Sequence, residues 1–137
     1  MQSSNSRKRL IAISSLYTLF FLVTLFAAYT NRLPLDLLAQ LPYYDKLGHL
    51  ILYFIPTYLG HRLFKQKHVL WLGFSIPFFP GIFTLFTLTE ELIQGFSPYR
   101  TLDAGDMICS LGGIVCGYLL AQRAKPHKAP KNRSTQN

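Results

Sequence analysis

The sequence contains few cysteines, few acidic residues and few charged residues of any kind. Its two cysteines, Cys109 and Cys116, lie in one apolar segment, which excludes a disulfide framework and the ligand spacing of a zinc finger; we interpret both as small packing residues. Aspartate and glutamate together number six in 137 residues. No internal repeat is evident, and the length predicts a single domain.

The chain is nevertheless rich in apolar residues, which make up half of it, while its net charge is +8. These two properties are compatible if the apolar segments lie in lipid and the charges lie at their ends. The basic residues flank apolar segments and do not alternate with aromatic residues on a polar surface, so we expect no nucleic-acid partner. Anionic lipid headgroups are the expected counter-charge.

Four apolar segments predict an all-α, polytopic membrane protein with four transmembrane helices. The first segment has no charged residue and extends ~31 Å at ~1.5 Å per residue, enough for one bilayer core. It follows a basic triplet, a pattern that also suits a cleaved signal peptide, although the segment is longer than a usual signal core. The four segments are Leu10–Thr30, Leu47–Phe64, Val69–Leu88 and Met107–Ala121.

Prolines and glycines modify these segments. We expect Pro56 to be tolerated in the second helix because a neighbouring group can satisfy the carbonyl that proline frees. The Pro77–Gly81 cluster is expected to kink or break the third helix. Residues 31–44 are either a short interfacial helix with a leucine stripe or an irregular loop. Gly113 and Gly117 form a small-residue step that lets another helix approach closely, and this face is the candidate surface for a homo-oligomer.

The distribution of charge predicts the orientation of the helices. All but Arg32, Lys46 and Arg100 of the 14 lysines and arginines lie at the termini or in the loop after the second segment, whereas all six acids lie on the opposite side. The positive-inside rule then puts both termini in the cytoplasm. We therefore divide the chain into a basic N-terminus (1–9), a four-helix membrane domain (10–122) and a basic, disordered cytoplasmic tail (123–137).

Polar residues recur at about one-turn spacing at the ends of three apolar segments, where a low dielectric makes unpaired charge costly. This spacing puts Asp45, His49 and Tyr53 on one helix face, and it likewise pairs Glu91 with Gln94 and Asp106 with Ser110. The orientation above brings all three sets to the outer side of the membrane. We therefore expect a polar pocket at the outer face. The sets are Asp45, Lys46, His49 and Tyr53; Glu91 and Gln94; and Arg100, Asp103, Asp106 and Ser110.

In this order, and between matching apolar segments, the three sets resemble the VanZ-like family of small bacterial membrane proteins over roughly Asp45–Gly117. That family commonly has asparagine where this chain has Ser110, and serine keeps a hydroxyl but lacks the paired donor and acceptor of an amide. The resemblance implies a multi-pass protein of the bacterial inner membrane. The founding member is associated with teicoplanin resistance, but the resemblance implies neither a particular reaction nor that this chain confers resistance.

Three functions fit the polar sets. The first is structural: a buried network of ion pairs and hydrogen bonds that fixes the helix ends. The second is recognition of an amphiphilic envelope ligand, either a membrane lipid or a lipid-linked cell-wall precursor, with Arg100 and Lys46 facing a phosphate. Because carboxylates outnumber basic residues on that side of the membrane, a phosphate would bind there only together with a cation. The third is an enzyme acting on a lipid-linked or phosphorylated substrate, with His49 as general base oriented by Asp45 or Glu91.

The sequence assigns no cofactor and predicts no metal site. His49 with Glu91 and Asp106 is chemically able to bind a divalent cation, but no close ligand spacing indicates it. We favour the binding function over the enzyme, for which His49 and Glu91 are the candidate catalytic residues. The predicted ligand-binding residues are Asp45, Lys46, Tyr53, Gln94, Arg100, Asp103, Asp106 and Ser110.

Overall fold

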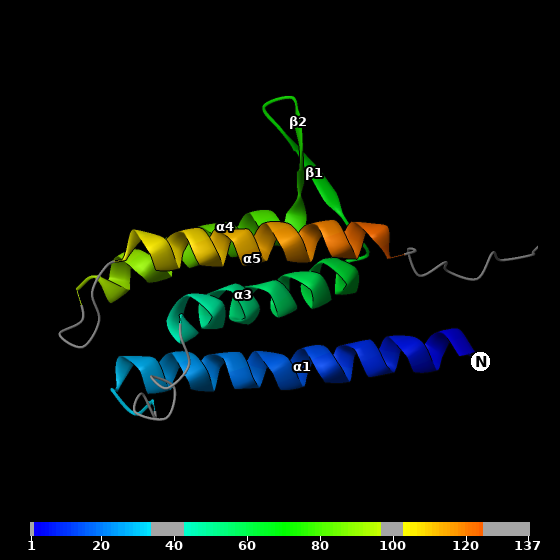
Figure 1. The fold of residues 1–137 in the computed structure, drawn as a ribbon. Coiled ribbons are helices and arrows are strands. Elements are labelled where there is room, and N and C mark those ends of the chain that lie inside the picture. The colour runs from blue at the N-terminus through cyan, green and yellow to red at the C-terminus, as the bar shows by residue number, and fades with distance from the viewer. Residues whose placement is uncertain (1, 34–42, 97–102, 125–137) are drawn as a thin grey trace, which may run out of the picture.

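A computed structural model of the chain describes residues 2–33, 43–96 and 103–124. Within these ranges the helices lie side by side, and Figure 1 shows the start of α1 and the end of α5 at the same end of the bundle. Two helices, α1 and α5, are long and apolar enough to cross a membrane. The elements are α1 (Gln2–Tyr29), α3 (Tyr44–Leu63), β1 (His68–Trp71), β2 (Phe74–Pro77), α4 (Phe78–Gln94) and α5 (Ala104–Arg123).

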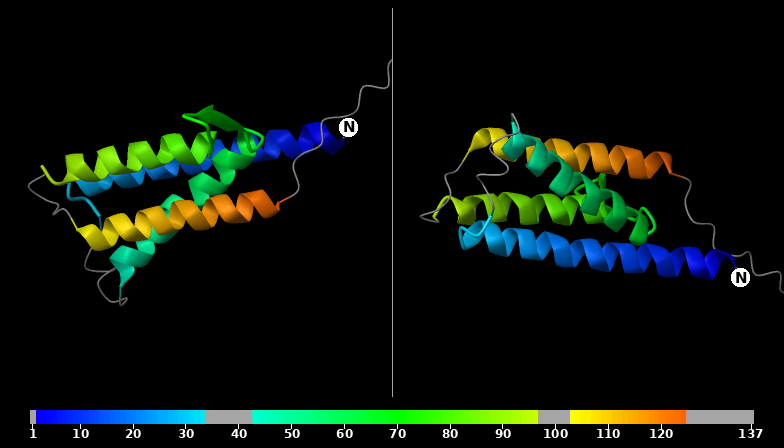
Figure 2. Two further views of the ribbon diagram at one scale, coloured as in Figure 1. Left: turned by 90° about the horizontal axis from the view of Figure 1, so that it is seen from above. Right: turned by 60° about the horizontal axis from the view of Figure 1, so that its bottom comes forward.

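Helix α3 is the central element. It packs most extensively on α5 and also contacts α1 and α4, and Figure 2 shows it crossing α5 obliquely. A Cβ atom on Gly113 would collide with the carbonyl oxygen of Leu50, and one on Gly117 with that of Phe54. The close helix approach predicted for this glycine step is therefore confirmed. Because α3 of the same chain makes that approach, the step is not an open surface for a second copy.

Pro56 lies inside α3 without ending it. A proline at this position leaves the carbonyl of Leu52, one turn earlier, without its helical donor. The hydroxyl of Tyr17 on α1 donates a hydrogen bond to that carbonyl oxygen at 3.3 Å. The prediction that a neighbouring helix satisfies the freed carbonyl is confirmed.

The third apolar segment is helical only in its second part, so the expectation of a helix from Val69 onward is wrong. Strands β1 and β2 pair in antiparallel fashion, with Trp71 opposite Phe74. Leu72 and Gly73 form the two-residue turn between them, with φ values of 51° and 83°. Positive φ at both turn positions matches the twist of a hairpin, and β-branched and aromatic residues favour the flanking strands.

The proline cluster begins α4 and does not kink it. Pro77 is the N-cap residue, and Pro80 lies within the first turn. The backbone nitrogens of a first turn have no helical acceptor, so the missing N–H of Pro80 removes no bond there. The proline pair therefore marks the boundary between the hairpin and the helix.

The bundle is apolar outside and polar inside. Among the described residues, nine polar or charged side chains are buried, against five apolar ones. Helix α1 exposes large apolar side chains along much of its length, including Leu16 at 71% and Phe26 at 62%. Cys116 is also exposed, contrary to its interpretation as a packing residue, while Cys109 is half-buried. A water-soluble protein normally shows the reverse distribution.

Several predictions concern residues outside the described ranges. The choice between an interfacial helix and a loop for residues 31–44 depends on residues 34–42, which lie outside these ranges. The predicted disordered tail beyond Ala124 and the predicted position of Arg100 also lie outside them.

Candidate functional site

Three helix ends meet at the end of the bundle opposite the start of α1 (Figure 1). They are the start of α3, the end of α4 and the start of α5, and hydrogen bonds or ion pairs join side chains of α3 to both of the others. For the described residues, the predicted convergence of three polar sets is confirmed. The side chains involved are Asp45, Lys46, His49, Tyr53, Glu90, Gln94, Asp103, Asp106 and Ser110.

His49 links α3 to α5. Its Nδ1 atom lies 3.0 Å from Oγ of Ser110, while its Nε2 atom lies 3.9 Å from Oδ1 of Asp45 and 3.8 Å from Oδ2 of Asp106. The side chains of His49 and Asp106 are only 9% and 6% exposed. The two carboxylate distances exceed hydrogen-bond length. Ser110 therefore orients the ring, and Nε2 faces both carboxylates within ion-pair distance but beyond hydrogen-bond length.

Lys46 and Asp103 lie beside this group. Nζ of Lys46 lies 3.2 Å from Oδ2 of Asp103 and 3.5 Å from Oδ1 of Asp106. Asp103 is also the N-cap of α5, and its Oδ1 accepts a hydrogen bond from the backbone N–H of Gly105 at 2.7 Å. The hydrogen bond from Gly105, followed by the contact with Lys46, holds the pKa of Asp103 below its ordinary value. Lys46 thus neutralises part of the carboxylate charge at this helix end.

A second buried group joins α3 to α4. The hydroxyl of Tyr53 donates to Oε2 of Glu90 at 3.0 Å, and Nε2 of Gln94 donates to the other oxygen of Glu90. The sequence-based selection chose Glu91, which is also buried, and missed Glu90. The four-residue spacing between Glu90 and Gln94 was the available signal, because it puts the two side chains next to each other on a helix.

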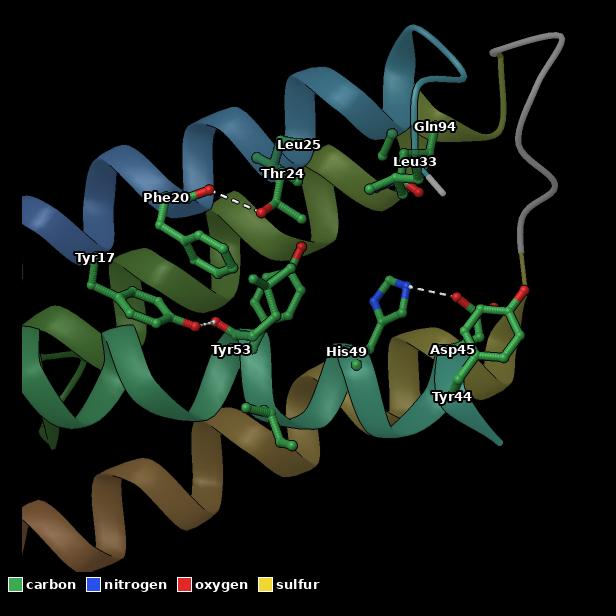
Figure 3. A pocket seen from close by; sticks show the side chains of 14 residues that line it. Tyr17, Phe20, Thr24, Leu25, Leu33, Tyr44, Asp45, His49, Tyr53 and Gln94 are labelled. Carbon is green, nitrogen blue, oxygen red and sulfur yellow. Dashed lines mark hydrogen bonds and ion pairs between the residues drawn. The ribbon is translucent and has the colours of Figure 1, made fainter. Parts of the chain in front are cut away.

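A cleft of about 350 Å³ lies between α1 and α3 beside these groups. Figure 3 shows Phe20 on α1 and Tyr53 and His49 on α3 directed toward the space between the two helices. Most of the wall is apolar, and Figure 3 shows Asp45, His49 and Gln94 toward one end of the cleft, with Tyr17 and Phe20 toward the other. The apolar part includes Phe20, Leu25, Ile51 and Leu52.

Sequence reasoning did not find the contribution of α1 to this cleft, because it selected candidate residues only from the polar sets at the ends of the other three apolar segments. Tyr17, Phe20, Thr24 and Ala28 line the cleft from α1. Their spacing of three or four residues puts them on one helix face. That pattern was present in the sequence, but it is hard to distinguish in a segment where nearly every residue is apolar.

The geometry limits the chemistry available here. Ser110 is 0% exposed, so its hydroxyl is inaccessible to a substrate in the cleft although it contacts His49. The pair therefore orients the imidazole and does not present a nucleophile. The face of His49 that is relevant to a ligand is the one carrying Nε2, because His49 and Asp45 both line the cleft.

Comparisons with protein-family models, curated proteins and solved structures found no match for this chain. The functional argument therefore depends on the cleft and the polar groups at its end.

Proposed function

We propose that this chain is a VanZ-like, multi-pass membrane protein that binds an amphiphilic envelope lipid or lipid-linked cell-wall precursor between α1 and α3. The observation that carries this proposal is the cleft, which is apolar along the helices and polar at one end. An amphiphile is divided in the same way, into an apolar chain and a polar headgroup. Its chain contacts Phe20 and Ile51, and its headgroup reaches Asp45, His49 and Gln94.

The membrane setting is supported by the inverted distribution of polarity. An apolar outer surface is stable in lipid, and buried polar groups are tolerated there when other groups of the protein satisfy them. We propose that α3 and α4 cross the inner membrane together with α1 and α5, with both termini in the cytoplasm. In this orientation the polar end of the cleft opens at the outer face, and the basic residues near Arg62 and Arg123 lie at the cytoplasmic face.

A purely structural network explains the contacts of His49 and Glu90 but not the cleft. The cleft is partly open and mostly apolar, so the chain of an amphiphile has room to enter between the two helices. The cleft therefore favours a binding function over a role confined to stability.

Native mass spectrometry of the full chain, purified in mild detergent, tests this proposal. We expect the wild-type protein to retain lipid and Ile51→Trp, which narrows the cleft, to lose it. Leu119→Trp is the matched control: Leu119 is also exposed and apolar, at 51% against 46% for Ile51, but it lies on α5 away from the cleft. Equal lipid retention by both variants would contradict binding in the cleft, provided that both melt near the wild-type temperature.

A further inference from the structure

We propose that Asp45, His49 and Asp106 bind one divalent transition-metal cation at the polar end of the cleft. Each residue offers one ligand atom, and the three atoms lie within 4.8 Å of one another. One imidazole nitrogen and two carboxylate oxygens suit Zn²⁺, Mn²⁺ or Fe²⁺. The ligand set considered from the sequence included Glu91, and the fold brings in Asp45 instead.

The distances allow the site to form with small side-chain movements. Two ligands that are each about 2.1 Å from a metal stand about 3.0–3.4 Å apart, whereas Nε2 of His49 is 3.8–3.9 Å from the two carboxylate oxygens. Asp45 is 49% exposed and can rotate inward.

Ser110 positions the ring for this role. Metal-binding histidines usually donate the N–H of the other ring nitrogen to a neighbouring acceptor, which sets the tautomer. Nδ1 of His49 faces Oγ of Ser110 at 3.0 Å. With the proton on Nδ1, Nε2 presents its lone pair toward Asp45 and Asp106.

The local charge favours a divalent cation. Among the side chains of this cluster that the structure describes, Asp45, Asp103 and Asp106 carry three negative charges when ionised, and Lys46 offsets one of them through its contacts with Asp103 and Asp106. A divalent cation cancels the two that are left. This cancellation matters because uncompensated charge is costly where Asp106 and His49 are buried.

Gln94 provides an independent sign that a ligand belongs at this end of the cleft. It is 2% exposed, and within the described part of the chain its Oε1 atom has no hydrogen-bond partner. Buried polar atoms are normally satisfied. Since Gln94 lines the same cleft as Asp45 and His49, Oε1 can accept a hydrogen bond from a metal-bound water or from a headgroup hydroxyl.

The cation also specifies the headgroup, and this step rests on the proposed lipid binding. Three protein ligands leave coordination positions open, and two of the three ligand residues line the cleft. A phosphate oxygen of an anionic amphiphile would occupy one of those positions. The cation thus explains how an anionic headgroup can bind beside carboxylates.

The test uses the full chain in detergent, stripped with EDTA and titrated with Mn²⁺ alone. Electron paramagnetic resonance should show one tightly bound Mn²⁺ per chain, and spin-echo modulation should show coupling to an imidazole nitrogen. Absence of that coupling in the wild-type protein would overturn the site, and this result does not depend on any variant folding.

Two variants with the same change of charge test the ligand assignment. Asp106→Asn should weaken Mn²⁺ binding by at least about tenfold, since even outer-shell changes cost about 10–100-fold. Asp103→Asn should weaken it by less than about threefold, because Asp103 is half exposed and its charge is screened. Equal losses in the two variants would indicate diffuse charge attraction and overturn the proposal.

The binding of dodecyl phosphate then tests the metal site and the lipid-binding cleft independently. Its affinity should rise when Mn²⁺ is present, and this rise should disappear in Asp106→Asn. Ile51→Trp should block dodecyl phosphate while leaving Mn²⁺ binding unchanged. Tight Mn²⁺ binding with no effect on dodecyl phosphate would overturn the bridging role alone, whereas a failure of Ile51→Trp to block the amphiphile would contradict the proposed function and not the metal site.

Discussion

The two sides of α3 meet their neighbours in different ways. Toward α5 the backbones approach across Gly113 and Gly117, and no Cβ atom fits between them. Toward α1 large side chains hold the helices apart, with the Phe21 ring edge-on to Tyr53 at 5.5 Å between centroids, and a cleft remains beside them. The first interface fixes the position of the polar side chains, and the second leaves room for a ligand to reach them.

The difference follows from the residues available on each side. Glycines allow main-chain contact, which offers many short contacts and little freedom to shift. On the α1 side, large side chains such as Phe20 and Tyr17 lie between the helices and line the cleft. A change in the α3–α5 interface should therefore affect folding strongly, whereas a change in the α1–α3 interface should affect it weakly.

The largest effect is expected for Gly113→Ala. The new Cβ would collide with the carbonyl oxygen of Leu50, which cannot move without moving α3, so we expect a loss of about 3 kcal/mol in the free energy of unfolding. An SDS-unfolding titration in mixed micelles measures it. Gly112→Ala is the control, because its Cβ would meet only Cδ1 of Leu50 at 3.8 Å. That variant should gain up to about 1 kcal/mol from helix propensity. Similar values for the two variants would show that the interface is not tightly packed.

A smaller effect is expected for Tyr53→Phe. The change removes the hydroxyl that donates to buried Glu90 at 3.0 Å, and an acceptor that loses a buried partner costs about 1–3 kcal/mol. The same titration measures this loss. Tyr118→Phe is a control on α5, where the hydroxyl accepts a 3.3 Å hydrogen bond at a half-buried position. A cost for Tyr53→Phe no greater than for Tyr118→Phe would mean that the Glu90 contact contributes little.

In the α1–α3 interface, Tyr17→Phe should cost about 1 kcal/mol, because it removes the donor to the Leu52 carbonyl. The cost should fall toward zero in a Pro56→Ala background, where the restored N–H reaches the same carbonyl. A double-mutant cycle measures this coupling. Additive effects of the two changes would show that Tyr17 does not compensate for the proline.

The smallest effect concerns pH. The pKa of Asp103 is lower in the folded protein than its ordinary value, so its ionised form stabilises the fold above the unfolded-state pKa, and this contribution is lost as pH falls through the folded-state pKa. The melting temperature of wild type should therefore exceed that of Asp103→Asn at neutral pH, and the difference should shrink below about pH 4. A difference that is constant or grows on acidification would contradict the assigned role of Asp103.

The sequence predicts well those features that depend on local pattern. Helical segments around Leu16, Tyr53 and Ile114 were identified from their high content of apolar residues, although their ends were set one to several residues differently. The compensation of Pro56 and the convergence of three polar helix ends were also predicted, since both follow from where polar groups must go in a low dielectric. The segment after His68 was mispredicted because apolar residues without periodicity suit a strand or a helix equally.

What the sequence alone determined is which parts of the chain are apolar, where the charges divide, and that the polar residues lie at helix ends. Only the tertiary structure decided that Glu90 accepts a hydrogen bond from Tyr53, that Asp45 joins His49 and Asp106, and that a cleft lies between α1 and α3. Those outcomes depend on the rotation of each helix about its axis and on the distance between axes. Both are set by side chains packing across helices that are remote in sequence, so no local pattern encodes them.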